Sequence, residues 1–301
     1  MPLPASEPIL YREELIQAIA SLELKAKKRV TSLLVGDYRS AFKGSGMQFK
    51  EFRRYEPGDD IRHLSWTVTA RTGHPTVKLY EEERELNVLL LIDVSGSSLF
   101  AVKDRPRLEM YSELVALIGF AAIRSGDSFG MLLFSDEPHA YLPPSRTRHQ
   151  VSVAIRKLLG EPFRGKKSDL RPALTHLRRG LRRKTLVMVL SDFLLPSFSS
   201  ELSPLCGFHD MILLHCYDDA ERGQLGPGVL EARDPETGEI FLLDGNSKRV
   251  RNHLAQHQLQ LSQTLEDSCR ELGADYLPLS AEDDYLQRLV HFFRNRGPSH
   301  L

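Results

Sequence analysis

The chain has 301 residues, of which 41% are hydrophobic and 27% charged, and its 40 Lys and Arg balance 40 Asp and Glu. This is an ordinary globular composition, and the length fits one large α/β domain with an appendage. Proteins that coat nucleic acid or anionic membranes need a surplus of Lys and Arg. The zero net charge therefore argues against both classes, and we predict no nucleic-acid partner.

Two further features bear on where the protein works. The three cysteines are widely spaced without a C-x-x-C pair, which is typical of a reducing compartment and offers no zinc-ribbon pattern. The longest apolar stretch, 115–123, has nine residues, and a bilayer-spanning helix needs roughly 18–20. The start of the chain, MPLPASEPILYREEL, lacks the basic and apolar regions of a secretory signal. We therefore expect a cytoplasmic protein without a membrane span.

The first 86 residues are predicted to form a helix at 13–26 and then a small β-rich extension, because Gly, aromatic and basic residues alternate there. Within the extension, Pro57-Gly58 predicts a turn that presents Asp59, Asp60 and Arg62. We interpret it as a turn held by an Asp–Arg pair that docks the extension on the main domain. A corner for partner recognition is the alternative interpretation.

From residue 87 to 301, short apolar runs alternate with helical patterns, which indicates βαβ units and a mostly parallel sheet. Only Ser-Asp-Glu-Pro separates the second and third runs, too short a link for a parallel crossover, so the third is predicted to be an antiparallel edge strand. The predicted strands are 87–93, 128–134, 139–142, 185–191, 211–216 and 274–277, with a hairpin insertion at 229–243. The predicted helices run from about Pro106 to Gly126, and at 147–159, 170–181, 248–272 and 283–294.

The first strand of this domain ends in D-V-S-G-S, which places Asp93, Ser95 and Ser97 at the carboxyl end of a parallel strand. Open α/β sheets bind ligands at that edge. A carboxylate and two hydroxyls two residues apart supply the hard oxygen ligands that Mg²⁺ prefers. Ser168 before a helix and Asp192 after a strand add two oxygen donors, and all three loops converge if their strands are neighbours. Taken singly, Ser168 is a typical helix N-cap and Asp192 a typical turn residue.

Together these residues resemble the metal-ion-dependent adhesion site of the von Willebrand factor A fold, whose pattern is Asp-x-Ser-x-Ser, then Thr, then Asp. Ser168 stands where that family usually has Thr, which keeps the hydroxyl. The resemblance implies a von Willebrand factor A-like, doubly wound α/β fold. It also implies that Ser95, Ser97 and sometimes Ser168 contact Mg²⁺ or Mn²⁺, while Asp93 and Asp192 act largely through bound waters. An acidic side chain of a protein partner then completes the site.

The amino-terminal motifs are similar to those of the bacterial family catalogued as domain of unknown function 58. The similar segments are GSGMQFKEFRRYEPGDDIRHLSW, TARTG, EEERELNVLLLIDVSGSS, RDPETGE and FFRNR. Ser65 precedes Trp66 where the family commonly has Asp, and many relatives carry amino-terminal transmembrane helices that this sequence lacks. Relatives are associated with MoxR-type AAA+ ATPases, so the resemblance implies an adaptor or co-chaperone in protein maturation or complex assembly.

Three hypotheses for function follow. The first is a non-enzymatic, metal-dependent protein-interaction module. The second is a Mg²⁺-dependent phosphoryl-transfer or hydrolytic enzyme that uses the same Asp and Ser residues; a phosphotransferase of the haloacid dehalogenase type usually has a second Asp where Ser95 stands. The third is a structural protein with an empty site. The basic segment 164–184, with nine Lys or Arg and one acidic residue, is expected to lie beside the metal loop and steer an acidic partner toward it.

Overall fold

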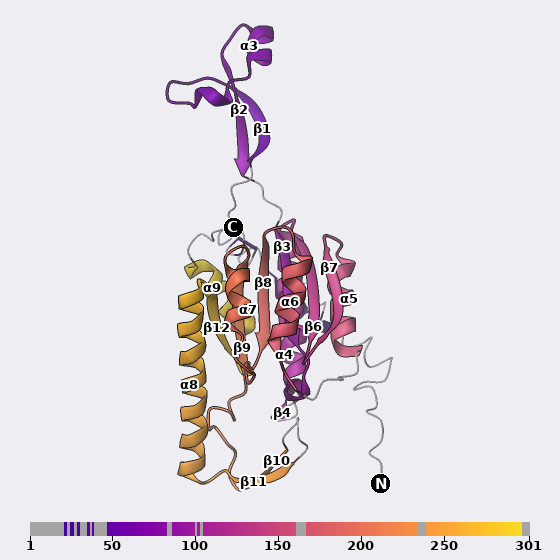
Figure 1. The fold of residues 1–301 in the computed structure, drawn as a ribbon. Helices are drawn as coiled ribbons and strands as arrows, with labels where there is room; N and C mark the ends of the chain where they lie inside the picture. Colours follow the sequence, from indigo (N-terminus) through magenta and orange to yellow (C-terminus); the bar gives the residue numbers. More distant parts are fainter. Residues whose placement is uncertain are drawn as a thin grey trace.

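The computed structural model describes the chain in several stretches, most of which form one α/β unit (Figure 1). The predicted helix at 13–26 falls largely outside them, and within it residues 21–22 and 25–26 are helical. The described residues are 21–22, 25–26, 29–30, 35–36, 38, 47–82, 86–99, 101–102, 105–160, 167–233 and 239–296.

A six-stranded sheet in the order β12-β9-β8-β3-β6-β7 forms the centre of this unit. Every neighbouring pair is parallel except β6 and β7, which are antiparallel at the edge. The predicted edge strand is thus confirmed, and its cause is the short connection after β6. The strands are β3 (Asn87–Asp93), β6 (Ser128–Phe134), β7 (Pro138–Ser145), β8 (Thr185–Ser191), β9 (Asp210–Tyr217) and β12 (Asp275–Ser280).

Helices cover both faces of the sheet, which explains why the central strands are continuously apolar. On β3, Val88, Leu90 and Ile92 pack toward α4, α5 and α9, whereas Leu89 and Leu91 pack toward α6, α7 and α8. All five side chains are fully buried. The helices are α4 (Arg107–Arg124), α5 (His149–Gly160), α6 (Leu170–Gly180), α7 (Ser199–Cys206), α8 (Lys248–Leu272) and α9 (Tyr285–Asn295).

Of the helices that the structure describes from end to end, α7 and α3 (Trp66–Thr72) were not predicted. The eight-residue α7 begins with two serines and contains Pro204, a residue that interrupts helical patterns. The seven residues of α3 include Val and Thr, which favour strands. By contrast, α8 begins and ends where predicted, and Gly273 closes it with a φ of 71°.

Part of the amino-terminal region belongs to the main core. Ala26, Val30 and Tyr38 are buried in the same cluster as α4 and α9, and the Tyr38 ring lies edge-on to Phe293 at 5.6 Å between centroids. The guanidinium of Arg29 also donates to carboxylates on both helices, Glu113 and Asp284. These residues therefore pack on the main domain, and the division at residue 86 stays a prediction.

The β-rich extension contains an antiparallel pair, β1 (Met47–Arg54) and β2 (Thr76–Glu82), which flank α3 and the 3₁₀ turn η1 (Ile61–His63). The predicted turn is confirmed, because Gly58 has a φ of 112°. An Asp–Arg pair is confirmed too, because Arg62 donates to Asp60 at 2.7 Å. Arg53, which was not predicted, donates to Asp59 at 2.8 Å, and docking of the extension on the main domain stays a prediction. These contacts all lie within the extension.

The predicted hairpin is also confirmed, as β10 (Val229–Arg233) and β11 (Ile240–Asp244). Figure 1 shows it, with the start of α8, beyond the end of the sheet at which β3 and β8 finish. A 3₁₀ turn, η2 (Gly96–Leu99), and the two-residue strands β4 (Ala101–Val102) and β5 (Arg105–Pro106) follow β3 at the same end. Within the described stretches, none of the helices has both the length and the apolar character that crossing a membrane requires.

Candidate metal centre

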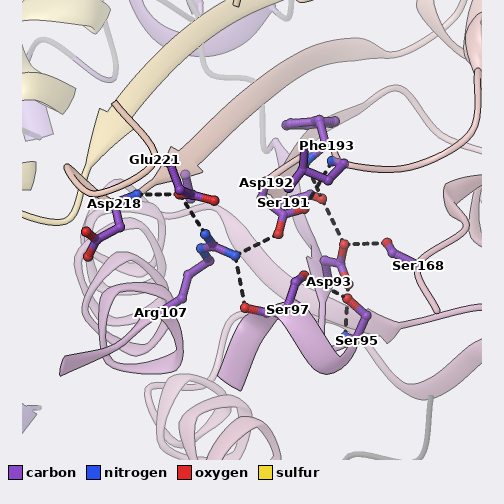
Figure 2. Close-up of polar contacts among 12 residues, drawn as sticks. Asp93, Ser95, Ser97, Arg107, Ser168, Ser191, Asp192, Phe193, Asp218 and Glu221 are labelled. Atoms are coloured by element: carbon purple, nitrogen blue, oxygen red, sulfur yellow. Dashed lines mark hydrogen bonds and ion pairs between the residues drawn. The ribbon is translucent and has the colours of Figure 1, made fainter. Parts of the chain in front are cut away.

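The predicted site lies at the carboxyl end of β3, where the chain order reverses. β3 is flanked by β8 on one side and β6 on the other, so its carboxyl end is the topological switch point at which open α/β sheets bind ligands. Asp93 ends β3, Asp192 follows β8, and Ser168 precedes α6. Figure 2 shows these side chains together with Ser95 and Ser97.

Asp93 is the centre of a hydrogen-bond network. Its Oδ1 accepts from the backbone N–H of Ser95 at 2.9 Å. Its Oδ2 accepts from the hydroxyls of Ser168 at 2.6 Å and Ser191 at 2.8 Å. These donors replace the water that this carboxylate loses, since it is only 1% exposed. The N-cap of α6 is Asp169, so the interpretation of Ser168 as a helix N-cap is wrong, and the Ser168 hydroxyl binds Asp93 instead.

The hydroxyls of Ser95 and Ser97 lie 3.1 Å apart. Ser95 is fully buried and Ser97 partly exposed, so this pair leads from the buried carboxylate toward the surface. The turn η2, which begins at Gly96, brings the two hydroxyls together. In an extended strand, side chains two residues apart point to the same face but lie further from each other.

Asp192 is held by the turn that follows β8. Phe193 has a φ of 55°, a left-handed conformation that costs a residue with a side chain about 1 kcal/mol or more. Hydrogen bonds stabilise this turn: the N–H of Phe193 donates to the Ser191 hydroxyl at 2.9 Å, and the N–H of Leu194 donates to Oδ1 of Asp192 at 3.1 Å. The strained turn fixes the Asp192 carboxylate next to the Asp93 network.

Arg107, the first residue of α4, supplies the counter-charge of Asp192. Its Nη1 donates to Oδ2 of Asp192 at 2.6 Å and to the Ser97 carbonyl at 2.9 Å. Its Nη2 donates to Glu221 at 2.9 Å, and Glu221 also accepts from the backbone N–H of Asp218 at 2.6 Å. The contacts of Arg107 with Asp192 and Glu221 are ion pairs, and the Arg107 side chain is buried, with an exposed fraction of 5%.

The pKa directions reflect this burial. Desolvation and the nearby charge of Asp192 raise the pKa of Asp93, although hydrogen bonds from Ser168 and Ser95 oppose the shift. Burial likewise raises the pKa of Glu221 against the opposing effect of Arg107. For Arg107, burial lowers the pKa, but the charges of Asp192 and Glu221 outweigh it and the net shift is upward. The guanidinium is therefore a permanent positive charge.

The residues present fit a hard divalent ion. Two carboxylates and three hydroxyls from three loops converge, and oxygen donors of this kind suit Mg²⁺ and Mn²⁺. Within the described stretches, no group of three or more His, Cys, Asp or Glu side chains could hold a metal, so a site here depends on its serines. Asp93, Ser95, Ser97, Ser168 and Asp192 as a ligand set remain a prediction.

Sequence reasoning missed Ser191, Arg107 and Glu221. Ser191 stands directly before Asp192, so the strand end S-D was a visible signal. A cation in the first turn of a helix is unfavourable next to the helix dipole, and Arg107 in that position could have indicated a nearby carboxylate. Nothing local marks Glu221, which is 114 residues from Arg107 along the chain.

The expectation that the basic segment 164–184 lies beside the metal loop is wrong for most of the basic residues that the structure describes. Lys167 and Arg171 lie near the site end of α6, and Arg171 is paired with Asp169. The helix then runs back along the sheet, and the segment reaches β8 at Thr185, which pairs with Asn87 at the start of β3. The exposed residues at that far edge are Arg178, Arg179, Arg182, Arg183 and Lys184.

Sheet order, the antiparallel edge strand and helices on both faces define a von Willebrand factor A-like α/β protein. The family model described as "Protein of unknown function DUF58" matches residues 51–264. The chain belongs to this family. It is 30% identical to "Uncharacterized protein Mb1516" of Mycobacterium bovis over 294 residues, which cover 94% of this chain and 90% of that protein.

Two solved structures are similar in fold. The VWA domain of SpRpn10 is 11% identical, with a TM-score of 0.41, and the match covers 72% of this chain and 100% of that one. Proximal thread matrix protein 1 from the mussel byssus, in a structure with a zinc-occupied MIDAS motif, is 16% identical with a TM-score of 0.36; the match covers 44% of this chain and 38% of that one.

Proposed function

We propose that this protein is a non-enzymatic interaction module that binds an acidic protein partner through a divalent ion, Mg²⁺ or Mn²⁺, in the cytoplasm. The observation that carries the proposal is the convergence of Asp93, Ser168 and the Ser95–Ser97 pair, with Asp192 fixed beside them. Bound there, the ion would offer a coordination position to a carboxylate of the partner. Asp93, Ser95, Ser97, Ser168 and Asp192 would hold it.

The arrangement of side chains supports binding more than catalysis. General acid–base chemistry needs a titratable group within reach of the reacting atoms. His215, on the strand next to β8, instead hydrogen-bonds Tyr276 at 2.7 Å, and burial lowers its pKa to about 4. Arg107 is committed to Asp192 and Glu221. A phosphoryl-transfer enzyme that uses the same Asp and Ser residues is the second candidate.

The partner that we propose is a MoxR-type AAA+ ATPase, with this chain acting as an adaptor or co-chaperone in protein maturation or complex assembly. The family resemblance supports this proposal. The basic segment does not support steering of the partner to the ion, because its described arginines lie mainly at the opposite edge of the sheet. The carboxylate of the partner would be attracted chiefly by the ion itself.

Binding of the purified protein to the purified MoxR-type ATPase of the same organism, in Mg²⁺ and in EDTA, tests the proposal. We expect a complex in Mg²⁺ that EDTA dissociates. Asp93→Asn should abolish it, because the amide keeps the size of the side chain but removes its charge. Asp267→Asn is the matched control, since Asp267 is an exposed carboxylate on α8 that pairs with Arg270.

Binding that is indifferent to EDTA and to Asp93→Asn would contradict the metal bridge. An assay of phosphate-ester hydrolysis on the same samples separates the second candidate. Metal-dependent turnover by the wild type that Asp93→Asn abolishes would favour the enzyme.

A further inference from the structure

Arg107 and Glu221 lie outside the predicted ligand set. Arg107 contacts that set at the carboxylate of Asp192 and at the backbone carbonyl of Ser97. Both oxygens of Asp192 accept hydrogen bonds, Oδ1 from Leu194 N–H and Oδ2 from Arg107. Asp93 is stabilised differently, because hydroxyls and a backbone N–H surround it. The two carboxylates of the site thus have distinct supports, one neutral and one cationic (Figure 2).

Glu221 competes with Asp192 for the same guanidinium. Arg107 is buried and cannot exchange one carboxylate for water, so its charge is shared between the two acids. Glu221 is itself fixed, because its Oε2 also accepts the N–H of Asp218. Glu221 balances part of the positive charge of Arg107. Asp192 therefore keeps more of its own negative charge for an ion at the site.

We propose that Arg107 is a positioning residue for Asp192, and that Glu221, through Arg107, sets the divalent-ion affinity of the site. The loop 218–221 would then control the site without contributing a ligand. This inference rests on the proposed function, because it concerns the affinity of the same site. Thermodynamic linkage is reciprocal, so an ion that binds Asp192 also changes the strength of the ion pair between Arg107 and Glu221.

The test is the Mn²⁺ affinity of the full chain, measured by electron paramagnetic resonance of free Mn²⁺, for the wild type, three single variants and one double variant. Glu221→Gln removes one of the two carboxylates that pair with Arg107, so more of the Arg107 charge acts on Asp192 and we expect Mn²⁺ to bind about fivefold more weakly or worse. Asp218→Asn is the matched control, since it removes one negative charge from the same loop, and its side chain accepts from Ala220 N–H. We expect a change of less than about twofold for this control.

Arg107→Lys is the third variant. A lysine keeps the charge but lacks the planar fork that reaches Asp192, Glu221 and the Ser97 carbonyl together. In this background, Glu221→Gln should have little further effect on the Mn²⁺ affinity, because the link between Glu221 and Asp192 is already broken. Urea unfolding of each apo variant separates a loss of affinity from a loss of fold.

Equal loss of affinity in Glu221→Gln and Asp218→Asn would overturn this inference, because a general electrostatic field would then suffice. Full additivity of Arg107→Lys and Glu221→Gln would also overturn it. A wild type that binds no Mn²⁺ would overturn both this inference and the metal-dependent function. If the wild type binds Mn²⁺ and Glu221→Gln binds it with the same affinity, this inference is overturned and the metal-dependent function is not.

Discussion

A buried arginine lies between two carboxylates at each end of the parallel strands, yet the surroundings differ. We call the side of the sheet at which the parallel strands end the carboxyl edge, and the side at which they begin the amino edge. At the carboxyl edge, Arg107 joins Asp192 to Glu221. At the amino edge, Arg296 joins Asp210 and Asp275, the first residues of β9 and β12. Arg296 follows α9 and links this helix to two adjacent strands. Arg107 instead binds the carboxylate of Asp192, which lies next to the serine hydroxyls of the candidate site.

The charge of the two edges differs as well. Five loops follow strands at the carboxyl edge, those after β3, β6, β8, β9 and β12, and together with the segment before α6 they contain many acidic residues in the described part of the chain. Their acidic residues are Asp93, Asp136, Glu137, Asp169, Asp192, Asp218, Asp219, Glu221, Glu282, Asp283 and Asp284. The amino edge has the exposed arginines after α6. The same buried arginine motif therefore serves strand packing at one edge and a candidate ion site at the other, and local context decides which.

The largest effect is expected from Arg296→Gln at the amino edge. Removing the guanidinium leaves the carboxylates of Asp210 and Asp275 without it, which should lower the free energy of unfolding by about 3 kcal/mol. Urea denaturation measures the loss, and Arg296→Lys should recover part of it. The Mn²⁺ affinity of the folded variant should equal that of the wild type; a parallel fall in affinity would show that the two edges are not independent.

The next largest effect is expected from His215, whose burial should make the free energy of unfolding depend on pH. Burial lowers its pKa from 6.5 to about 4 in the folded protein, so the unfolded chain takes up the proton first as the pH falls. Stability from this group is complete above pH 6.5 and is lost toward pH 4. Between pH 7 and pH 5 it should contribute a loss of about 2 kcal/mol.

Urea denaturation at pH 7 and pH 5 checks this expectation with His215→Gln, which should remove that part of the pH dependence. His257→Gln is the control, because His257 is exposed on α8. The same pH dependence in His215→Gln as in the wild type would contradict it.

A smaller effect is expected from the ion itself at the carboxyl edge. A ligand that binds only the folded state at ten times its dissociation constant adds about 1.4 kcal/mol to the free energy of unfolding. We expect Mg²⁺ to produce this gain in the wild type and not in Asp93→Asn, as measured by thermal unfolding at several concentrations. A gain that survives in Asp93→Asn would place the ion elsewhere.

The smallest effect should follow from Arg182→Gln with Arg183→Gln at the amino edge. The seven residues of β8, Thr185–Ser191, separate these arginines from the site by about 20 Å, well beyond the Debye length of about 8 Å at physiological salt. We expect the Mn²⁺ affinity to change by less than about twofold and the free energy of unfolding by less than about 0.5 kcal/mol. A marked change in affinity would restore the idea that the basic segment acts on the site.

The sequence by itself determined the α/β architecture and most of its elements. Continuous apolar runs specify buried parallel strands, and β3, β6 and β8 begin and end where predicted. A short link dictated the antiparallel edge, and the position of Asp93 and Asp192 at strand ends indicated one common site. These signals are local, because periodicity and spacing depend on neighbouring residues.

The tertiary structure alone decided which distant groups meet. Only the sheet order places the Ser191 hydroxyl on Asp93, and only the packing of α4 brings Arg107 between Asp192 and Glu221. It also sends most of the arginines of the basic segment to the far edge, since α6 must run back along the sheet so that β8 can begin there, parallel to β3. Charge that is adjacent in sequence is thereby separated in space, and the acidic site end and the basic opposite edge exist only in the folded chain.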